Sequence, residues 1–214
     1  MDVVLDHLPL YLRGMRTTVA LTLWSYAAAL VLGGLTAAMR VSPVRPLRSA
    51  AAFYVETVRN TPLPVLLLLF FFGFPKLGVI YSPFVSAVLM LALYTGAFAA
   101  EIVRSGINTV GVGQVEAARS LGLSFNQLLG EVVLPQALRS VVPPMGTLFI
   151  ALTKNSSLAS LISVPEIMFR ADQVTNDTAR PTPALIGAAL TYLALTLPST
   201  FGLHALERRL AIKR

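Results

Sequence analysis

Five long apolar segments constrain this chain more than any other feature of its sequence. They lie roughly at residues 17–39, 51–74, 83–103, 145–164 and 184–206. Each is close to the length of about twenty apolar residues that a helix needs to cross a bilayer. Only 13 % of the residues are charged, and the mean hydropathy is +0.72, which is too apolar for an ordinary soluble domain. We therefore expect an all-α integral membrane protein with about five transmembrane helices, forming a single domain over residues 1–214.

The segments between these apolar runs contain proline or charge. Residues 40–48 combine three arginines with two prolines, and the residues around Pro75 form a short turn before the third run. The stretch 104–144 carries Glu116, Arg119, Glu131 and Arg139, and charges of this kind are costly inside lipid. This stretch predicts a large helical loop on one side of the membrane.

The distribution of the seventeen Lys and Arg residues predicts the orientation. Ten lie in residues 40–48, in the 104–144 loop and in the C-terminal tail, five lie on the opposite side, and Arg59 and Lys154 lie inside spans. Cytoplasmic loops carry the excess of basic residues, so the loop and the C-terminus are expected in the cytoplasm and the N-terminus outside. Asp2 precedes any basic residue, which is not the pattern of a secretory signal, so the first apolar run is expected to stay in the protein.

Several classes of function are disfavoured by composition. The formal charge is +7, but the basic residues border apolar runs instead of forming one basic face, so we expect no nucleic acid as a partner and membrane lipid instead. The chain has no cysteine, and His7 and His204 are isolated, so we expect no metal site and no redox chemistry.

A spaced motif stands inside the 104–144 loop. It reads Glu116-Ala117-Ala118-Arg119-Ser120-Leu121-Gly122 and is followed, after nine residues, by Val132-Val133-Leu134-Pro135. This spacing resembles the EAA coupling loop of the permease subunits of ATP-binding-cassette (ABC) importers with the type I fold. Only Val132 departs from the family pattern, which has isoleucine there.

The motif also has a physical interpretation. Small side chains at Ala117 and Ala118 allow a helix to approach a partner closely, Gly122 permits a sharp turn, and Pro135 marks where a second helix must restart. The resemblance implies that this helix docks on an ATPase subunit. The ATPase-coupling residues are then Glu116, Ala117, Ala118, Gly122, Leu134 and Pro135. An amphipathic helix resting on the membrane surface is the alternative.

The chain itself contains no Gly-x-x-x-x-Gly-Lys-Ser/Thr phosphate-binding loop. We therefore expect it to bind no cofactor, with ATP and Mg held by a separate ATPase.

Other stretches resemble the polar amino-acid (histidine, glutamine, glutamate) branch of these permeases. They are residues 56–62, 100–107 and 153–158. More narrowly, residues 40–44, 58–62, 104–110 and 151–155 look like the shorter permease of a glutamate uptake system. The resemblance implies alternating access in a complex with a second, homologous permease as a heterodimer, two ATPase subunits and an extracytoplasmic solute-binding protein. Arginine, histidine and glutamine are the alternative substrates.

Two pairs of opposite charges stand three residues apart near span ends, Glu56 with Arg59 and Glu101 with Arg104. Residues at this spacing are neighbours on a helix, so each pair is expected to neutralise itself. Pro62 follows the first pair and predicts a kink. These five residues are candidates for a gate, with a purely structural role as the alternative.

Lys154 lies near the middle of the fourth apolar run, where a lysine costs roughly 2.5 to 3.5 kcal/mol on insertion scales. With Asn155, Ser156 and Ser157 it predicts a substrate pathway, because an ammonium and hydroxyls suit a carboxylate. The alternatives are a pairing of Lys154 with an acid of the partner permease and a serine-lysine dyad of a membrane enzyme.

Two further possibilities concern the whole chain and the charges after Pro165. Besides an importer permease and a membrane enzyme, a passive channel or scaffold is the third class of function, and it leaves the loop motif unexplained.

Glu166, Arg170 and Asp172 are interpreted as solvated charges or as contacts for a binding protein.

Overall fold

The computed structural model describes residues 2–210, and within that range every regular element is a helix, as the sequence predicts. The α-helices before the loop are α1 (Asp2–Asp6), α2 (Leu8–Val41), α3 (Arg45–Arg59), α4 (Leu63–Gly73) and α5 (Pro83–Asn108). Those in and after the loop are α6 (Val112–Ser120), α7 (Phe125–Gln127), α8 (Leu134–Asn155), α9 (Ile167–Thr178) and α10 (Pro181–Leu210). Three short elements complete the chain: the 3-10 helix η1 (Phe74–Leu77), the π-helix η2 (Leu128–Val133) and the 3-10 helix η3 (Ser156–Ile162).

The helices α2, α5 and α10 are each long and apolar enough to cross a membrane. Two bent pairs also pass this test when each is counted as one span: α3 with α4 and η1, and the helical run from η2 to η3 with α9. The chain thus has three to five candidate spans.

The second predicted span, residues 51–74, is not a single helix. The helix ends at Arg59, restarts at Leu63 and turns by 104° at the break. Pro62 has no N–H to continue the helical ladder, and the Asn60 side chain donates a 2.7 Å hydrogen bond to the Glu56 carbonyl at the helix end. The kink predicted at Pro62 is therefore a full break.

The fourth predicted span also differs from its expected bounds. The helix extends without interruption from Phe125 to Ile162, so it begins well inside the expected loop and not at residue 145. It includes the π-turn η2 directly before Pro135. A proline at this position removes the hydrogen bond to the carbonyl four residues earlier, and a wide π-turn accommodates that loss. Pro135 lies in the first turn of α8 after this π-turn and does not restart a separate helix, which corrects the sequence prediction.

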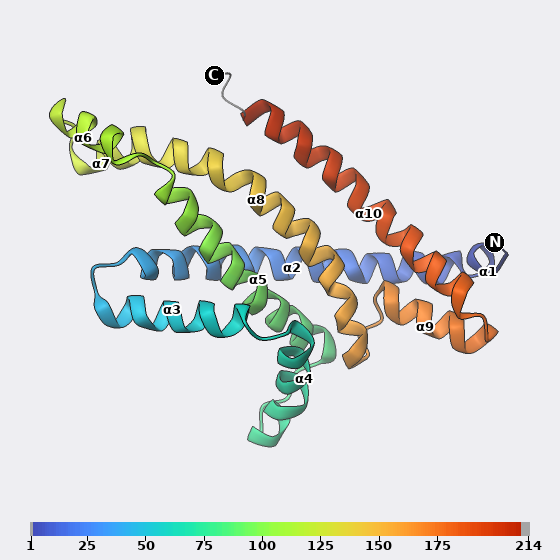
Figure 1. Cartoon of the computed structure of the whole chain (residues 1–214). Coiled ribbons are helices and arrows are strands. Elements are labelled where there is room, and N and C mark those ends of the chain that lie inside the picture. Colours follow the sequence, from blue (N-terminus) through green and yellow to red (C-terminus); the bar gives the residue numbers. More distant parts are fainter. Residues whose placement is uncertain (1, 211–214) are drawn as a thin grey trace.

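The long helices cross one another closely because their contact faces are small (Figure 1). On α2, Ala29, Gly33 and Ala37 recur every four residues and are turned toward α5. A Cβ added at Gly33 would lie 2.6 Å from Ala99 Cβ. Stripes of small residues allow helix backbones to approach in a membrane, where there is little hydrophobic force between helices.

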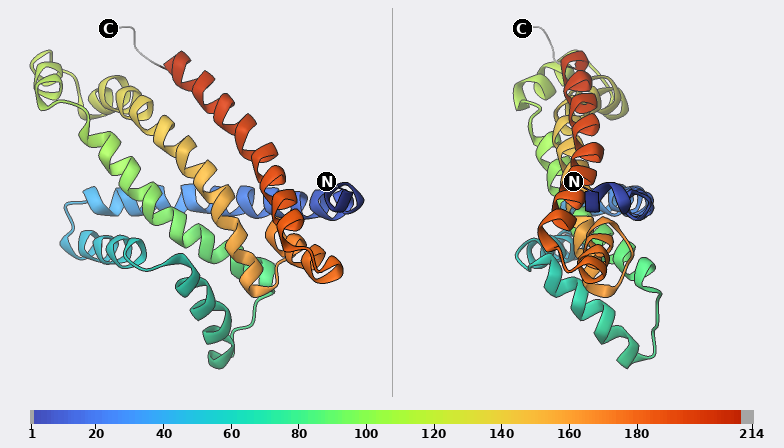
Figure 2. Two further views of the ribbon diagram at one scale, coloured as in Figure 1. Left: turned by 45° about the vertical axis from the view of Figure 1, so that its right-hand side comes forward. Right: turned by 90° about the vertical axis from the view of Figure 1, so that its right-hand side faces the viewer.

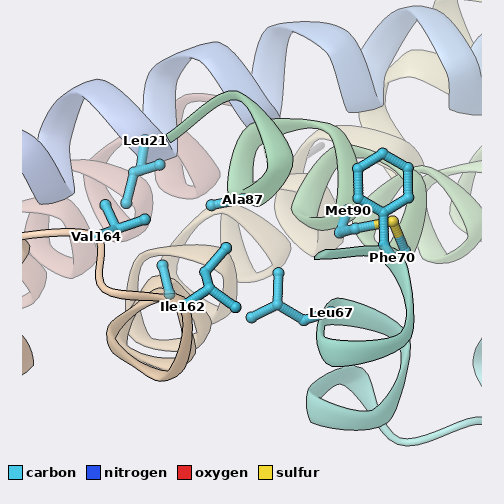
Figure 3. Packing of buried hydrophobic residues seen from close by; sticks show 8 residues of the cluster. Leu21, Leu67, Phe70, Ala87, Met90, Ile162 and Val164 are labelled. Atoms are coloured by element: carbon cyan, nitrogen blue, oxygen red, sulfur yellow. The ribbon is translucent and has the colours of Figure 1, made fainter. Parts of the chain in front are cut away.

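A hydrophobic cluster fixes α4 and η3 against this crossing (Figure 3). It joins Leu21 from α2, Leu67 and Phe70 from α4, Ala87 and Met90 from α5, and Ile162 and Val164 from the segment after α8. The bent second span is thus held in place by packing on both of its long neighbours.

The two ends of the helix bundle differ. Figures 1 and 2 place α6 and α7 at the end of the bundle opposite the N-terminal helix α1, with α9 near α1. The helix α10 runs from the α9 side back toward the end that carries α6 and α7.

Candidate functional site

The sharp turn of the predicted coupling loop is built around Gly122, which has a φ of +78°. Its N–H donates to the Arg119 carbonyl at 2.9 Å, and the Leu123 N–H donates to the Ala118 carbonyl at 3.3 Å. This pair of bonds is a Schellman motif, which terminates a helix with a left-handed residue at the position of Gly122. The structure thus supplies the physical reason for glycine in the motif: side chains with a Cβ are strained there.

The loop helix α6 presents a mixed surface. Glu116 and Ala117 are exposed, whereas Ala118 is 5 % exposed and lies on the face that packs toward η2. Only Ala117 of the two alanines is therefore available to a partner, which corrects the prediction that both are. Val112 and Leu121, which the motif did not single out, are 71 % and 84 % exposed. The sequence pattern that could have indicated these two residues is an apolar side chain at each end of a polar loop helix.

The loop is fastened directly to the long helices. Thr109, after the last residue of α5, donates a 3.1 Å hydrogen bond to Ser140 on α8. A Cβ at Gly106 would overlap the side chain of Val141, so the end of α5 and the start of α8 are in close contact. Leu134, the second-last residue of the motif, is exposed at the start of α8.

A cluster of three arginines surrounds Glu101 on α5. Arg40 Nη1 from α2 donates to Glu101 Oε2 at 2.9 Å, and Arg104 donates to Oε1, with its Nε at 3.0 Å. Arg59 Nη1, at the end of α3, lies 3.9 Å from Oε2. The Glu101–Arg104 pair predicted from the spacing is confirmed, and it is joined by two arginines from other helices.

The predicted Glu56–Arg59 pair is wrong. Glu56 is exposed and forms no ion pair with any residue between 2 and 210. The buried Val55 defines the face of α3 that packs toward α5, and Arg59 lies one turn further along that same face. Arg59 therefore reaches Glu101 on α5, while Glu56 lies on a different face.

A groove of about 450 Å³ begins at this cluster. One wall is a face of α5 with Phe98, Glu101, Ile102 and Ser105, and the other is a face of α8 with Pro144, Thr147, Leu148 and Ala151. Arg59, from the end of α3, also lines the groove, and its guanidinium lies 5.3 Å from the centre of the Phe98 ring. The groove is thus largely apolar with a charged end.

Lys154 lies at the last turn of α8 and is exposed, so this chain does not bury its ammonium. Asn155 and Ser157 are half-buried, whereas Ser156 is fully buried and donates to the Thr153 carbonyl at 2.8 Å. The four residues therefore do not form one site: Ser156 is engaged inside the bundle, and Lys154 is presented outside it. This geometry also removes Ser156 as a nucleophile beside Lys154.

Glu166 does not lie in the environment predicted for it, which was that of a solvated charge or a contact for a binding protein. It is fully buried and not solvated. Its carboxylate caps the N-terminus of α9, accepting from the N–H groups of Met168 at 2.9 Å and Phe169 at 2.8 Å. Tyr192 on α10 donates to the same carboxylate at 2.6 Å. Glutamate is not among the preferred N-cap residues, which are Ser, Thr, Asp and Asn, so the sequence contains no clear signal for this cap.

Residues 2–210 contain no group of three metal-ligating side chains close enough to hold a metal ion.

The sequence matches a known family over most of its length. Residues 29–212 match the family described as binding-protein-dependent transport system inner membrane component. The chain is 37 % identical to the probable glutamine ABC transporter permease protein GlnM of Bacillus subtilis (strain 168), over 98 % of this chain and 97 % of that protein. It is 41 % identical to the glutamate transport system permease protein GluC of Corynebacterium efficiens, over 96 % of each.

The fold matches solved transporters as well. A crystal structure of an amino acid ABC transporter with histidines superposes with a TM-score of 0.92 at 34 % identity, over 96 % of each chain. The MetNI methionine ABC transporter, at 20 % identity, shares the fold with a TM-score of 0.75.

Proposed function

Because this chain belongs to the family of binding-protein-dependent transport system inner membrane components, and is a permease subunit of an amino-acid ABC importer, we propose that it carries glutamate across the inner membrane. The observation that carries this proposal is the placement of its cations. Lys154 is exposed at the last turn of α8, Arg59 lines the α5–α8 groove, and both cations suit a substrate with two carboxylates. The likeness to GluC of Corynebacterium efficiens supports the same substrate.

We further propose the assembly around this chain. A second, homologous permease forms a heterodimer with it, two ATPase subunits bind ATP and Mg, and an extracytoplasmic binding protein delivers the substrate. The loop that carries α6 and the C-terminus lie in the cytoplasm, and the N-terminus lies outside. The excess of basic residues in the loops at the α6 side supports this orientation.

Coupling in this proposal runs through α6. Closure of the ATPase dimer displaces α6, whose exposed Glu116, Ala117 and Leu121 form the docking surface. The turn at Gly122 and the Thr109–Ser140 contact pass this displacement to α5 and α8, the two walls of the groove. A rigid-body movement of these helices then opens the groove to the other side of the membrane. The broken second span, held at Pro62 and Arg59, is the proposed gate element.

The substrate is tested by uptake of radiolabelled glutamate into proteoliposomes that contain the complete complex and its binding protein. Selective competition by unlabelled aspartate, and none by arginine or glutamine, is the expected pattern. Competition by arginine, histidine or glutamine in place of aspartate would be consistent with an amino-acid importer but would contradict glutamate as its substrate.

Lys154→Ala is expected to lower glutamate uptake in this assay by roughly ten- to a hundredfold. The reason is that a hydrogen bond to a charged group contributes about 1.5–3 kcal/mol. Lys76→Ala is the matched control, because Lys76 is also exposed but lies in η1, away from α8. Both variants should assemble with the ATPase. Unchanged uptake by Lys154→Ala would remove this residue from the pathway.

A further inference from the structure

The Glu101 cluster holds more positive charge than its one carboxylate neutralises. Both carboxylate oxygens are occupied, Oε2 by Arg40 and Oε1 by Arg104. Arg59 remains 3.9 Å from Oε2, and among the described residues its guanidinium donates no hydrogen bond. Three guanidinium groups thus share one carboxylate. A second anion beside Arg59 would be attracted by the excess charge and would find free donors.

Arg59 is also the most exposed arginine of the cluster. Its side chain is 41 % exposed, against 34 % for Arg104 and 17 % for Arg40, and of the three arginines it is the one that contributes to the lining of the α5–α8 groove. The Phe98 ring, 5.3 Å from the guanidinium, holds it at the groove wall through a cation–π contact and leaves the N–H edge to bind in the plane. Arg40 and Arg104 therefore form the hydrogen bonds to the Glu101 carboxylate, and the Arg59 guanidinium can bind a ligand.

The α8 wall of the groove lies on the face of α8 that continues toward Lys154. This wall contains Thr147 and Ala151. Lys154 is seven residues after Thr147 and three after Ala151, so it lies on the same face of α8, about 10 Å beyond Thr147 along the helix axis. Lys154 thus lies beyond the groove on its α8 face, on the α9 side, while Arg59 lies in the lining of the groove itself.

We propose that Arg59 is a second carboxylate-binding position, which receives the anionic end of the amino acid after it leaves Lys154. This inference rests on the proposed import of an anionic amino acid. Two positions of moderate affinity along a pathway favour movement, because the substrate is exchanged between them instead of being held at one. Glu101 acts as a positioning residue: it holds Arg40 and Arg104 and leaves Arg59 without a hydrogen bond.

The test compares Arg59→Gln, Arg59→Lys and the matched control Arg48→Gln in the reconstituted complex. Arg48 is exposed on the same helix, and its substitution removes the same charge. Arg59→Gln is expected to lower glutamate uptake at least roughly tenfold, since a charge-assisted hydrogen bond is lost. Arg59→Lys is expected to recover part of the rate, and Arg48→Gln to match the unsubstituted complex. ATP hydrolysis stimulated by the binding protein should persist in all three, which shows that Arg59→Gln is assembled.

A carboxylate of the substrate and a lipid phosphate share the chemistry that Arg59 recognises. Proteoliposomes of phosphatidylcholine alone distinguish them, since they contain no anionic lipid. The unsubstituted complex is expected to keep its uptake there; a fall to the level of Arg59→Gln would assign the position to a lipid headgroup and overturn the proposal. Arg59→Gln uptake equal to that of Arg48→Gln would also overturn it. Failure of the unsubstituted complex to import any acidic amino acid would instead overturn the proposed function.

Discussion

Replacing Glu166 by alanine is expected to lower the midpoint of thermal unfolding of this chain by an amount on the order of 10 °C. The fully buried carboxylate accepts hydrogen bonds from two N–H groups of α9 and from Tyr192 on α10, whose residues are half-buried. Its removal leaves these three donors without their acceptor, and the loss of one partner from a buried charged network costs about 3–5 kcal/mol. A change of 1 kcal/mol shifts the midpoint by about 2–4 °C in a chain of this size.

Asp172→Ala is the matched control for this measurement, because Asp172 lies on the same helix but is exposed. Its midpoint should change by little, since surface substitutions usually alter stability by less than about 0.5 kcal/mol. Tyr192→Phe removes one donor and should give an intermediate shift. Equal midpoints for Glu166→Ala and Asp172→Ala, measured on purified protein in detergent, would contradict the assignment of Glu166 as the buried link between α9 and α10.

Replacing Gly122 by valine is expected to abolish uptake and to remove stimulation of the ATPase by the binding protein, while the chain still reaches the membrane. The φ of +78° is strained for a β-branched residue, and the left-handed conformation costs about 1–2 kcal/mol even for simpler side chains. The Schellman turn would open, and α6 would lose its fixed angle to the helix that follows. The measurement is uptake together with ATP hydrolysis in the same proteoliposomes.

Gly130→Val isolates the effect of backbone conformation. A Cβ at either glycine meets no atom within 4 Å, but only Gly122 has a positive φ. The Gly130 variant should therefore retain transport. Glu116→Arg provides a second, independent variant, since it reverses a charge on the exposed docking surface without changing the turn. Normal uptake by both Gly122→Val and Glu116→Arg would contradict the role of α6 in coupling.

Local patterns in the sequence predicted the features that depend on local physics. Apolar length predicted the all-α membrane fold, and the motif spacing predicted the sharp turn at Gly122. The Glu101–Arg104 pair also followed from spacing alone, because both residues belong to one helix. Pro62 predicted a disturbance of the second span, although not its size of 104°.

The features that the sequence did not predict depend on contacts between distant segments. Arg40 and Arg59 meet Glu101 only because α2 and α3 both pack against α5. Glu166 is buried because α2, α9 and α10 close around it, with the Ile167 N–H donating to Thr18 on α2. Lys154 was expected inside the bundle because apolar length alone does not say which face of a helix is covered. Periodicity within one segment cannot supply this information.

ATP-driven accumulation of labelled glutamate tests most directly whether this chain is the permease of an ATP-driven glutamate importer. Proteoliposomes containing this chain, its partner permease, the ATPase and the binding protein are compared with vesicles that lack this chain and with complete vesicles that lack ATP. Accumulation above the external concentration is expected only when every component and ATP are present. Equilibration of glutamate across the membrane without ATP would identify a passive channel and would contradict the role of this chain as the permease of an ATP-driven importer.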